Sequence, residues 1–397
     1  MSAPEFHGSL EQADWPRREG MQILTRALGA ENIRWVGGAV RDTLLGVSVH
    51  DVDCATTHPP DEVMDRCAVA GIRTVPTGID HGTITAVLED GPVEITTLRH
   101  DVSTDGRRAT VTFATEWRED AARRDFTINA LFAHPESLEI SDYFGGLDDL
   151  AARRVRFIGD AKQRIAEDHL RILRYYRFQA RFGAELDTEA EEACAQLAGT
   201  LKGLSRERVA DELIKLLALP DPGETVERMF NHAVLRVVLP EASLRNVELM
   251  RELIVHEKRE DVAADPLRRL AALLPPSPDV AADVSARLRL SRAQRNVLVA
   301  VAGRFATDVD HPQALAYFEG NAVALHRLLL AGGDTKAICD WDAPTLPLKG
   351  GTIVDRGVAA GPEVARILKT VERRWVEEGF PDENRVEQIL TEELTPT

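Results

Sequence analysis

The order of apolar and polar positions predicts two kinds of structure along the chain. Up to about residue 150, short β-branched segments alternate with turns rich in glycine and proline, which is typical of strands. Residues 83–88 and 93–98 flank the turn residues 89–92, so they predict a hairpin. Further strands are predicted at 33–36, around 51–53 and at 139–144, and helices at 21–29 and about 58–70.

Beyond Gly183 the apolar residues follow a helical repeat almost throughout. Helices are predicted at 188–201, 207–219, 226–230, 265–274 and 362–378. We therefore expect an α+β fold: an N-terminal mixed α/β head with an antiparallel-containing sheet, followed by an all-α C-terminal region. A chain of 397 residues has room for two or three domains. We place the head at 1–150, a helical neck at 151–220 and an all-helical body at 221–397, with a boundary near the proline-rich turn 219–223.

The segment 161–182, between these two parts, predicts a single amphipathic helix. At 3.6 residues per turn one face is charged and the opposite face is apolar. The charged face holds Arg164, Glu167, Arg171 and Arg174. Such a face is also typical of an ordinary solvated helix with ion pairs four residues apart. The pattern alone therefore does not distinguish a solvated face from a face with a functional role.

The distribution of charge changes what the net charge suggests. A net charge of −17 argues against a nucleic-acid partner. Residues 151–181, however, contain nine Lys or Arg and only three Asp or Glu, which gives +6 there and −23 elsewhere. A basic stripe on an acidic body can attract a polyanion toward one cleft. Alternatively, some of these arginines pair with acids of the head.

Candidate chemistry lies just after the first predicted strand. Gly37-Gly38 interrupts the strand, and Arg41 follows in the first turn of a helix. Backbone N–H groups at such a turn attract phosphate. Asp51 and Asp53 alternate along the next strand, so both carboxylates leave the same face, and Mg²⁺ would relieve their repulsion. Taken separately, the two glycines fit a plain turn, and the two aspartates fit a solvated pair on a strand. The complete order of strand, glycine turn, arginine and aspartate pair suggests nucleotidyl transfer.

This order resembles the signature of the class II nucleotidyltransferases, the family of tRNA CCA-adding enzymes and bacterial poly(A) polymerases. The signature stands here as Gly37-Gly38-Ala39-Val40-Arg41-Asp42, followed by Asp51-Val52-Asp53. Two further motifs are similar to the family's: Arg123-Arg124-Asp125-Phe126-Thr127-Ile128-Asn129-Ala130 and Glu167-Asp168-His169-Leu170-Arg171. The resemblance covers roughly residues 33–183.

The resemblance implies roles for named residues. Asp51 and Asp53 would hold Mg²⁺, with Glu94, in a matching Glu-x-Thr-Thr context, as the third catalytic acid. Asp168 and Arg171 would act as an amino-acid template for the incoming base, and a polar loop at 101–113 would help change specificity from C to A. The residues implied in nucleotide binding are Gly38, Arg41, Arg124, Asp125, Asp168, Arg171, Arg174 and Arg177.

The function that the resemblance implies is template-independent addition of C and A to the 3′ end of tRNA, with CTP and ATP as substrates. Poly(A) polymerase and a non-catalytic RNA-binding protein of the same fold remain alternatives. Poly(A) synthesis requires sequence-independent binding of single-stranded RNA, which would favour a basic extension. The chain ends instead in the acidic segment Glu392-Glu393-Leu394-Thr395-Pro396-Thr397.

The remaining composition bears on location. Four cysteines (54, 67, 194 and 339) are scattered without metal-ligand spacing, residues 1–20 are polar, and no apolar run approaches 18 residues. We therefore expect a cytoplasmic protein with reduced thiols, no membrane association and no obligate protein partner.

Overall fold

A computed structural model of the chain describes residues 9–49, 51–104, 109–114 and 116–395. The chain forms two compact units, Met1–Pro240 and Glu241–Thr397. The three-part division at residues 150 and 220 stays a prediction. Within the described part of the chain, none of the helices combines the length and apolar composition that a bilayer crossing requires.

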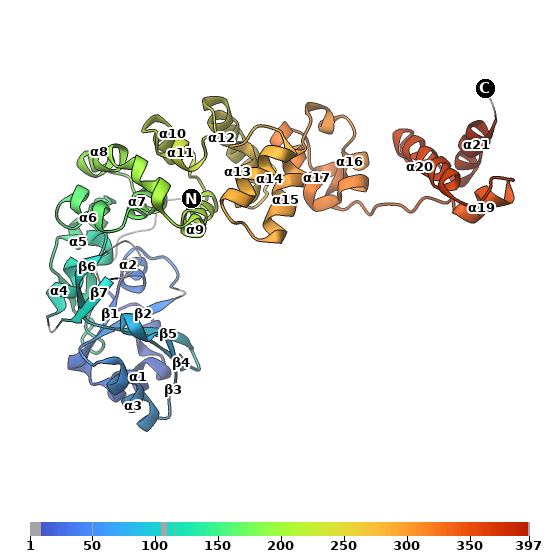
Figure 1. Ribbon diagram of the computed structural model, residues 1–397. Coiled ribbons are helices and arrows are strands. Elements are labelled where there is room, and N and C mark those ends of the chain that lie inside the picture. The colour runs from blue at the N-terminus through green and yellow to red at the C-terminus, as the bar shows by residue number, and fades with distance from the viewer. Residues whose placement is uncertain (1–8, 50, 105–108, 115, 396–397) are drawn as a thin grey trace. The chain divides into compact units, whose positions relative to one another are not determined.

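A seven-stranded mixed sheet is the centre of the first unit (Figure 1). Its strand order is β3-β4-β5-β2-β1-β8-β9, in which β2 and β5 are parallel and the other neighbours antiparallel. The strands are β1 Ile33–Val36, β2 Val52–Thr56, β3 Arg73–Gly78, β4 Thr83–Leu88, β5 Gly91–Thr97, β8 Leu131–Ala133 and β9 Ile140–Asp142. The predicted mixed head and the 83–98 hairpin are confirmed, whereas β3 and β8 were not predicted.

The two faces of this sheet differ in character. Trp35, Cys54, Ile84 and Ile95 are linked by register across four strands, so they share one face, and each is at most 1% exposed. This face forms the core under α1 (Glu19–Leu28) and α3 (Pro60–Val69), which pack against each other. Asp53 alternates with Cys54, so the opposite face carries the candidate carboxylates.

The predicted polar loop at 101–113 is wrong for most of its length. Strands β6 (Arg99–Thr104) and β7 (Ala109–Phe113) form a separate antiparallel pair. Residues 105–108, between these strands, lie outside the described residues. The β-branched residues on both sides of the polar centre explain the pairing, because such residues favour strands.

The predicted helix at 161–182 is also wrong, because the segment forms two helices. Helix α6 covers Ala161–Glu167 and α7 covers Arg171–Phe182, and Asp168 between them has an extended backbone (φ −148°, ψ 104°). The Asp168 side chain accepts a hydrogen bond from the Leu170 N–H at 3.1 Å. Aspartate side chains compete with helical backbone bonds in this way, which ends the first helix.

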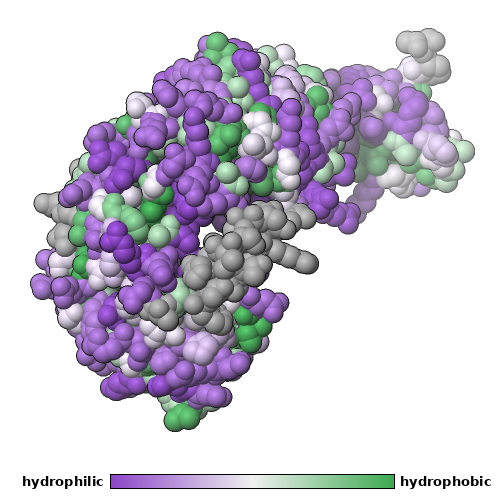
Figure 2. Space-filling model, turned by 60° about the vertical axis from the view of Figure 1, so that its left-hand side comes forward, coloured by the Kyte–Doolittle hydropathy of each residue, from purple (hydrophilic) through white to green (hydrophobic). Residues whose placement is uncertain are grey.

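The rest of the chain is helical, as predicted. Hydrophilic residues cover most of the described surface on the face shown in Figure 2, and hydrophobic residues are scattered among them. The remaining helices of the first unit are α2 Gly38–Leu44, α4 Trp117–Ala122, α5 Gly146–Ala151, α8 Thr188–Gln196, α9 Arg206–Leu217, α10 Gly223–Asn231 and α11 Val234–Val238. Those of the second are α12 Leu244–Arg259, α13 Pro266–Ala272, α14 Pro278–Arg287, α15 Arg292–Ala302, α16 Pro312–Glu319, α17 Asn321–Ala331, α18 Lys336–Cys339, α19 Gly350–Asp355, α20 Pro362–Glu377 and α21 Glu383–Leu394.

Candidate active site

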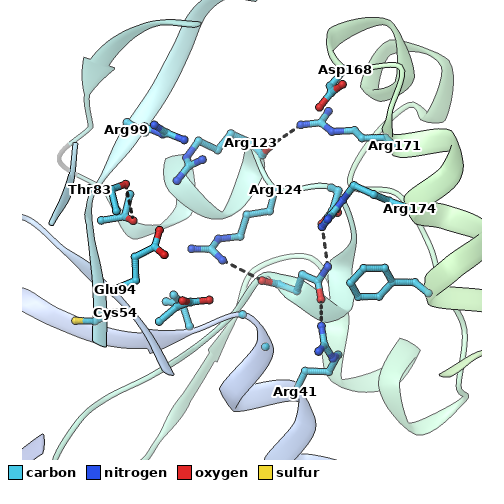
Figure 3. A pocket seen from close by; sticks show the side chains of 18 residues that line it. Arg41, Cys54, Thr83, Glu94, Arg99, Arg123, Arg124, Asp168, Arg171 and Arg174 are labelled. Atoms are coloured by element: carbon cyan, nitrogen blue, oxygen red, sulfur yellow. Dashed lines mark hydrogen bonds and ion pairs between the residues drawn. The ribbon is translucent and has the colours of Figure 1, made fainter. Parts of the chain in front are cut away.

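A cavity of about 560 Å³ in the first unit brings most of the predicted site residues together (Figure 3). Its walls come from the β1–α2 turn, from β2, β4 and β5, from residues 123–129 and from α7. The predicted residues that line it are Gly38, Arg41, Asp53, Glu94, Arg124, Asp125, Asp168, Arg171 and Arg174. Asp51 and Arg177 are not among its lining residues within the described part of the chain.

Two carboxylates stand side by side on the sheet. Asp53 on β2 and Glu94 on the parallel strand β5 are register partners, so their side chains leave the same face. Asp51 directly precedes β2 and is exposed. Burial raises the pKa of Asp53, and the negative charges of Glu94 and Asp51 raise it further, whereas the Arg124 guanidinium opposes the shift. A cation would relieve this repulsion.

The donor set fits a divalent ion that also binds substrate. In the described residues, no three His, Cys, Asp or Glu side chains converge as a metal site. Mg²⁺, however, is usually held by one or two carboxylates together with water and substrate phosphates. The neighbouring carboxylates of Asp53 and Glu94, with Asp51 close in sequence, meet that requirement.

At only one of the two glycines in this turn does the backbone conformation require glycine. Gly37 has φ 66° and ψ −122°, which L side chains rarely adopt, and α2 begins at Gly38. A Cβ atom on Gly37 would lie 3.2 Å from Arg124 Nη1, whereas one on Gly38 would lie 3.7 Å from Arg41 Nη2. The special backbone position is therefore Gly37, which was not among the predicted nucleotide-binding residues.

Arg41 is fixed deep in the head. It is 4% exposed, donates to Asp42 Oδ1 at 2.8 Å and to Asn129 Oδ1 at 2.5 Å, and its guanidinium lies 4.5 Å from the centre of the Phe182 ring. Burial lowers the pKa of Arg41, and the Asp42 carboxylate opposes that shift. Arg41 therefore presents its charge to the cavity from an anchored position.

The Arg123–Asp125 motif forms the wall between the sheet and α7. Arg124 donates to Asp120 Oδ2 at 3.2 Å and to the Asn129 carbonyl at 3.3 Å. Asp125 accepts from Asn129 Nδ2 at 2.9 Å and from Arg174 Nε at 2.8 Å. Burial alone would raise the pKa of Asp125, but Arg174 and the hydrogen bond from Asn129 outweigh burial and lower it. The motif is thus cross-linked to α7 by an ion pair.

Asp168 and Arg171 lie on the α7 side of the cavity, where the helix break places them (Figure 3). Asp168 Oδ2 accepts from Arg208 Nη2 at 2.6 Å. Arg171 donates to Glu167 Oε2 at 2.6 Å and to the Arg123 carbonyl at 3.1 Å. Both side chains are therefore held in place by several partners.

Two residues of α9 that sequence reasoning missed support this wall. Arg208 holds Asp168, and Glu212, 4% exposed, accepts from Arg177 Nε at 2.6 Å and lies 3.6 Å from Arg174 Nη1. The sequence does carry a signal for Glu212. It falls in the apolar stripe of α9, three residues after Val209 and four before Leu216, and a carboxylate at such a position needs a partner.

Comparisons with known proteins agree with this geometry. Residues 33–156 match the family model described as "Poly A polymerase head domain", and residues 183–245 match "Probable RNA and SrmB-binding site of polymerase A". Asp53, Glu94 and the Arg123–Asp125 motif lie within the first match. These matches define a class, the nucleotidyltransferases with a poly(A) polymerase head.

Relatives narrow the class. The chain is 38% identical over 402 residues to the mouse protein called "CCA tRNA nucleotidyltransferase 1, mitochondrial", covering 96% of this chain and 90% of that one. This protein therefore belongs to the CCA tRNA nucleotidyltransferase family.

Solved structures share the fold. The Bacillus stearothermophilus CCA-adding enzyme in complex with CTP aligns with a TM-score of 0.72 at 24% identity, covering 94% of this chain and 98% of that chain. The Thermotoga maritima CCA-adding enzyme complexed with tRNA_CCA aligns with a TM-score of 0.71 at 21% identity, covering 94% of each chain.

Proposed function

We propose that this protein adds C and A residues to the 3′ end of tRNA, from CTP and ATP and without a nucleic-acid template. The observation that carries the proposal is the cavity in which Asp53 and Glu94 face Arg171 and Arg174. Six arginines and four carboxylates line it, a formal excess of positive charge that suits a nucleoside triphosphate. The mouse relative is named for CCA addition, and the Thermotoga structure holds tRNA.

Nucleotidyltransferases of this family use divalent metal ions, and we assign Mg²⁺ to Asp51 and Asp53 here. Mg²⁺ held there would act as a Lewis acid, which would lower the pKa of the primer 3′-hydroxyl and neutralise charge on the departing pyrophosphate. Glu94 adds negative charge beside Asp53, and its exposed carboxylate can accept the proton of the 3′-hydroxyl. Catalysis then consists mainly of holding the two substrates in line.

The remaining residues divide between the phosphates, the ribose and the base. Gly38, Arg41 and Arg124 border the carboxylates, so we assign them to the triphosphate. Asp125 can accept from a ribose hydroxyl, and Arg174, paired with it, can turn its other N–H groups to phosphate or primer. Arg177 acts at one remove, since it holds Glu212 beside Arg174.

Asp168 and Arg171 are assigned to the base. A carboxylate accepts from the exocyclic amine of C or A, and a guanidinium donates to a ring nitrogen of either base. G and U present the opposite pattern of donors and acceptors, so the same pair rejects them. The pair faces the cavity from the end of α6 and the start of α7.

The test separates CCA addition from poly(A) synthesis. The protein is incubated with Mg²⁺, CTP and ATP, together with either a tRNA that lacks its CCA end or an unstructured oligonucleotide. We expect addition of three nucleotides to the tRNA and then arrest. Long A tails on the oligonucleotide with little addition to tRNA would establish poly(A) polymerase instead. Binding of tRNA without any addition would favour the non-catalytic alternative.

We also propose a cytoplasmic location. The proposal rests on the four cysteines, which are all free thiols, three of them buried. The mouse relative is by name mitochondrial, so localisation of a tagged chain in its own cell is the decisive measurement.

A further inference from the structure

One part of the sheet face beside the carboxylates has no role in the function described so far. Thr96 lies two residues beyond Glu94 on β5, so both side chains leave the same face. Across the antiparallel ladder, Thr83 pairs with Thr96 and Thr85 pairs with Glu94. Cross-strand partners share a face, so these threonines continue the surface on which Glu94 stands.

The hydroxyl groups on this face touch one another in pairs. Thr83 Oγ1 lies 3.2 Å from Thr96 Oγ1, and Thr85 Oγ1 lies 2.8 Å from Thr77 Oγ1 on β3. Thr77 is exposed and the other three are partly exposed. We name these four residues the hydroxyl strip. It runs from the carboxylates at β2 and β5 outward to β3, which is the edge of the sheet.

The strip differs in chemistry from the opposite wall. Asp125, Arg171 and Arg174 carry charge there, whereas the strip offers only neutral donors and acceptors. Threonine also favours strands without any ligand, so the strip alone would be an ordinary sheet surface. However, Thr83 and Thr96 line the same cavity as Glu94. Thr83 lies on the side away from Arg171 in Figure 3, and Thr96 is its cross-strand partner.

A polymerase must hold two substrates, one on each side of the catalytic acids. The charged wall suits the triphosphate, which leaves the strip for the RNA that is extended. We propose that the hydroxyl strip is the subsite for the primer's 3′-terminal nucleotides, with Thr83 and Thr96 hydrogen-bonded to the hydroxyls of the last ribose. Thr85 and Thr77 continue this contact to the preceding sugar. Arg99, which also lines this side, supplies charge for the connecting phosphate. This inference rests on the proposed function.

Hydroxyl contacts to a ribose give RNA-specific recognition, because the 2′-hydroxyl both donates and accepts. The test uses the double variant Thr83→Val/Thr96→Val, which removes the hydroxyls and keeps the branched shape. Steady-state kinetics are measured with tRNA ending in CC and with ATP, each varied separately. The same tRNA carrying a 2′-deoxy terminal residue is the second primer.

We expect KM for the tRNA to rise about three- to tenfold, the loss of one to two net hydrogen bonds, while KM for ATP stays unchanged. Discrimination between the ribose and 2′-deoxy primers should shrink toward one. The matched control is Thr74→Val. Thr74 is partly exposed on β3 and pairs with Ala86, which places its side chain on the opposite face. It should change neither KM.

Two outcomes would overturn the inference. A rise in KM for ATP alone would place the strip in the nucleotide subsite. Unchanged kinetics in a double variant whose unfolding temperature matches that of the wild type would show that the strip is only a sheet surface. Failure of the proposed function looks different, because the wild-type protein itself would then extend neither primer.

Discussion

Alanine at Gly37 should lower the stability of the protein, whereas alanine at Gly38 should leave it unchanged or raise it slightly. Gly37 has φ 66° and ψ −122°, a region that is costly for any residue with a Cβ atom, at about 1–3 kcal/mol. Its new methyl group would also meet Arg124 Nη1 at 3.2 Å, so this nitrogen, which donates to the Asn129 carbonyl, would have to move by a few tenths of an ångström. Both effects lower the free energy of unfolding.

Gly38 provides the matched control because it is the next residue and has the same side chain. A Cβ atom there would meet Arg41 Nη2 at 3.7 Å, an ordinary van der Waals contact, and the residue is the first of α2. Alanine is favoured over glycine in a helix and restricts the unfolded chain, which stabilises a protein by about 0.4–1 kcal/mol at compatible positions. Gly38→Ala should therefore be neutral or slightly stabilising.

The assay is thermal unfolding of both variants beside the wild type, followed by nucleotide incorporation below the lower transition. For a unit of this size 1 kcal/mol shifts Tm by about 2–4 °C, so Gly37→Ala should unfold roughly 2–12 °C lower. Equal Tm values for the two variants, or a lower Tm for Gly38→Ala, would refute the assignment of the strained turn to Gly37. If Gly38→Ala keeps its Tm but raises KM for CTP, the added methyl group obstructs the nucleotide, which is the result expected if the Gly38 backbone contacts the phosphates.

Three further predictions concern the cavity. Asp53→Asn should abolish incorporation of labelled nucleotide but leave tRNA binding close to wild type, and near-normal incorporation would rule out its metal-binding role. Arg171→Ala should relax discrimination against UTP and GTP, since a bidentate base contact contributes about 1–3 kcal/mol; a slower enzyme with unchanged base selectivity would instead assign Arg171 to structure. Asp125→Asn should lower stability at pH 7 by about 1.5–3 kcal/mol. Against the effect of burial, Arg174 and Asn129 lower the pKa of Asp125, so this contribution is present above the unfolded pKa of about 3.9 and is lost as pH falls through the lower folded value. Denaturant unfolding at several pH values checks this, and a difference that persists unchanged in acid contradicts it.

The strands that sequence reasoning found and missed differ in how they are buried. β4 and β5 largely alternate buried positions with more accessible ones and were predicted, because alternation is the signal of a half-buried strand. β3 has no buried residue and contains Pro76, which is tolerated at the sheet edge but gives no apolar pattern. β8 is only three residues long and buried at every position, so it has no period at all.

The break between α6 and α7 shows a second limit. The helical repeat of charged and apolar residues continues through residues 161–182, and nothing in that period marks Asp168. The break depends on the Asp168 side chain, which accepts a hydrogen bond from the Leu170 N–H instead of pointing into solvent. This position of the Asp168 side chain is also stabilised by Arg208, which lies 40 residues later in the sequence. Periodicity describes which face is buried, but it does not contain such distant contacts.

The candidate site was easier to predict than its support. The resemblance to family motifs pointed to Asp53, Glu94, Asp125 and Arg171, and the fold brings them to one cavity. The partners that hold these residues come from other elements. The sequence contains many charged residues, and nothing in it singles out the ones that become partners. Burial decides among them: Glu212 is 4% exposed, and a buried carboxylate needs partners, which Arg177 and Arg174 provide.

The ion pairs of the basic segment 151–181 bear on the proposal that Asp168 and Arg171 recognise the base. Composition suggested a stripe of positive charge, yet most of its arginines are bound in ion pairs. The partners are Asp149, Asp125, Asp42, Glu167 and Glu212. Free charge would attract any polyanion, whereas hydrogen-bond discrimination between bases requires donors and acceptors held within about 0.5 Å of their productive positions. Asp168 has two anchors and Arg171 has three. The ion pairs therefore give the site fixed geometry at the expense of diffuse charge, and fixed geometry is what the proposed base contacts of Asp168 and Arg171 require.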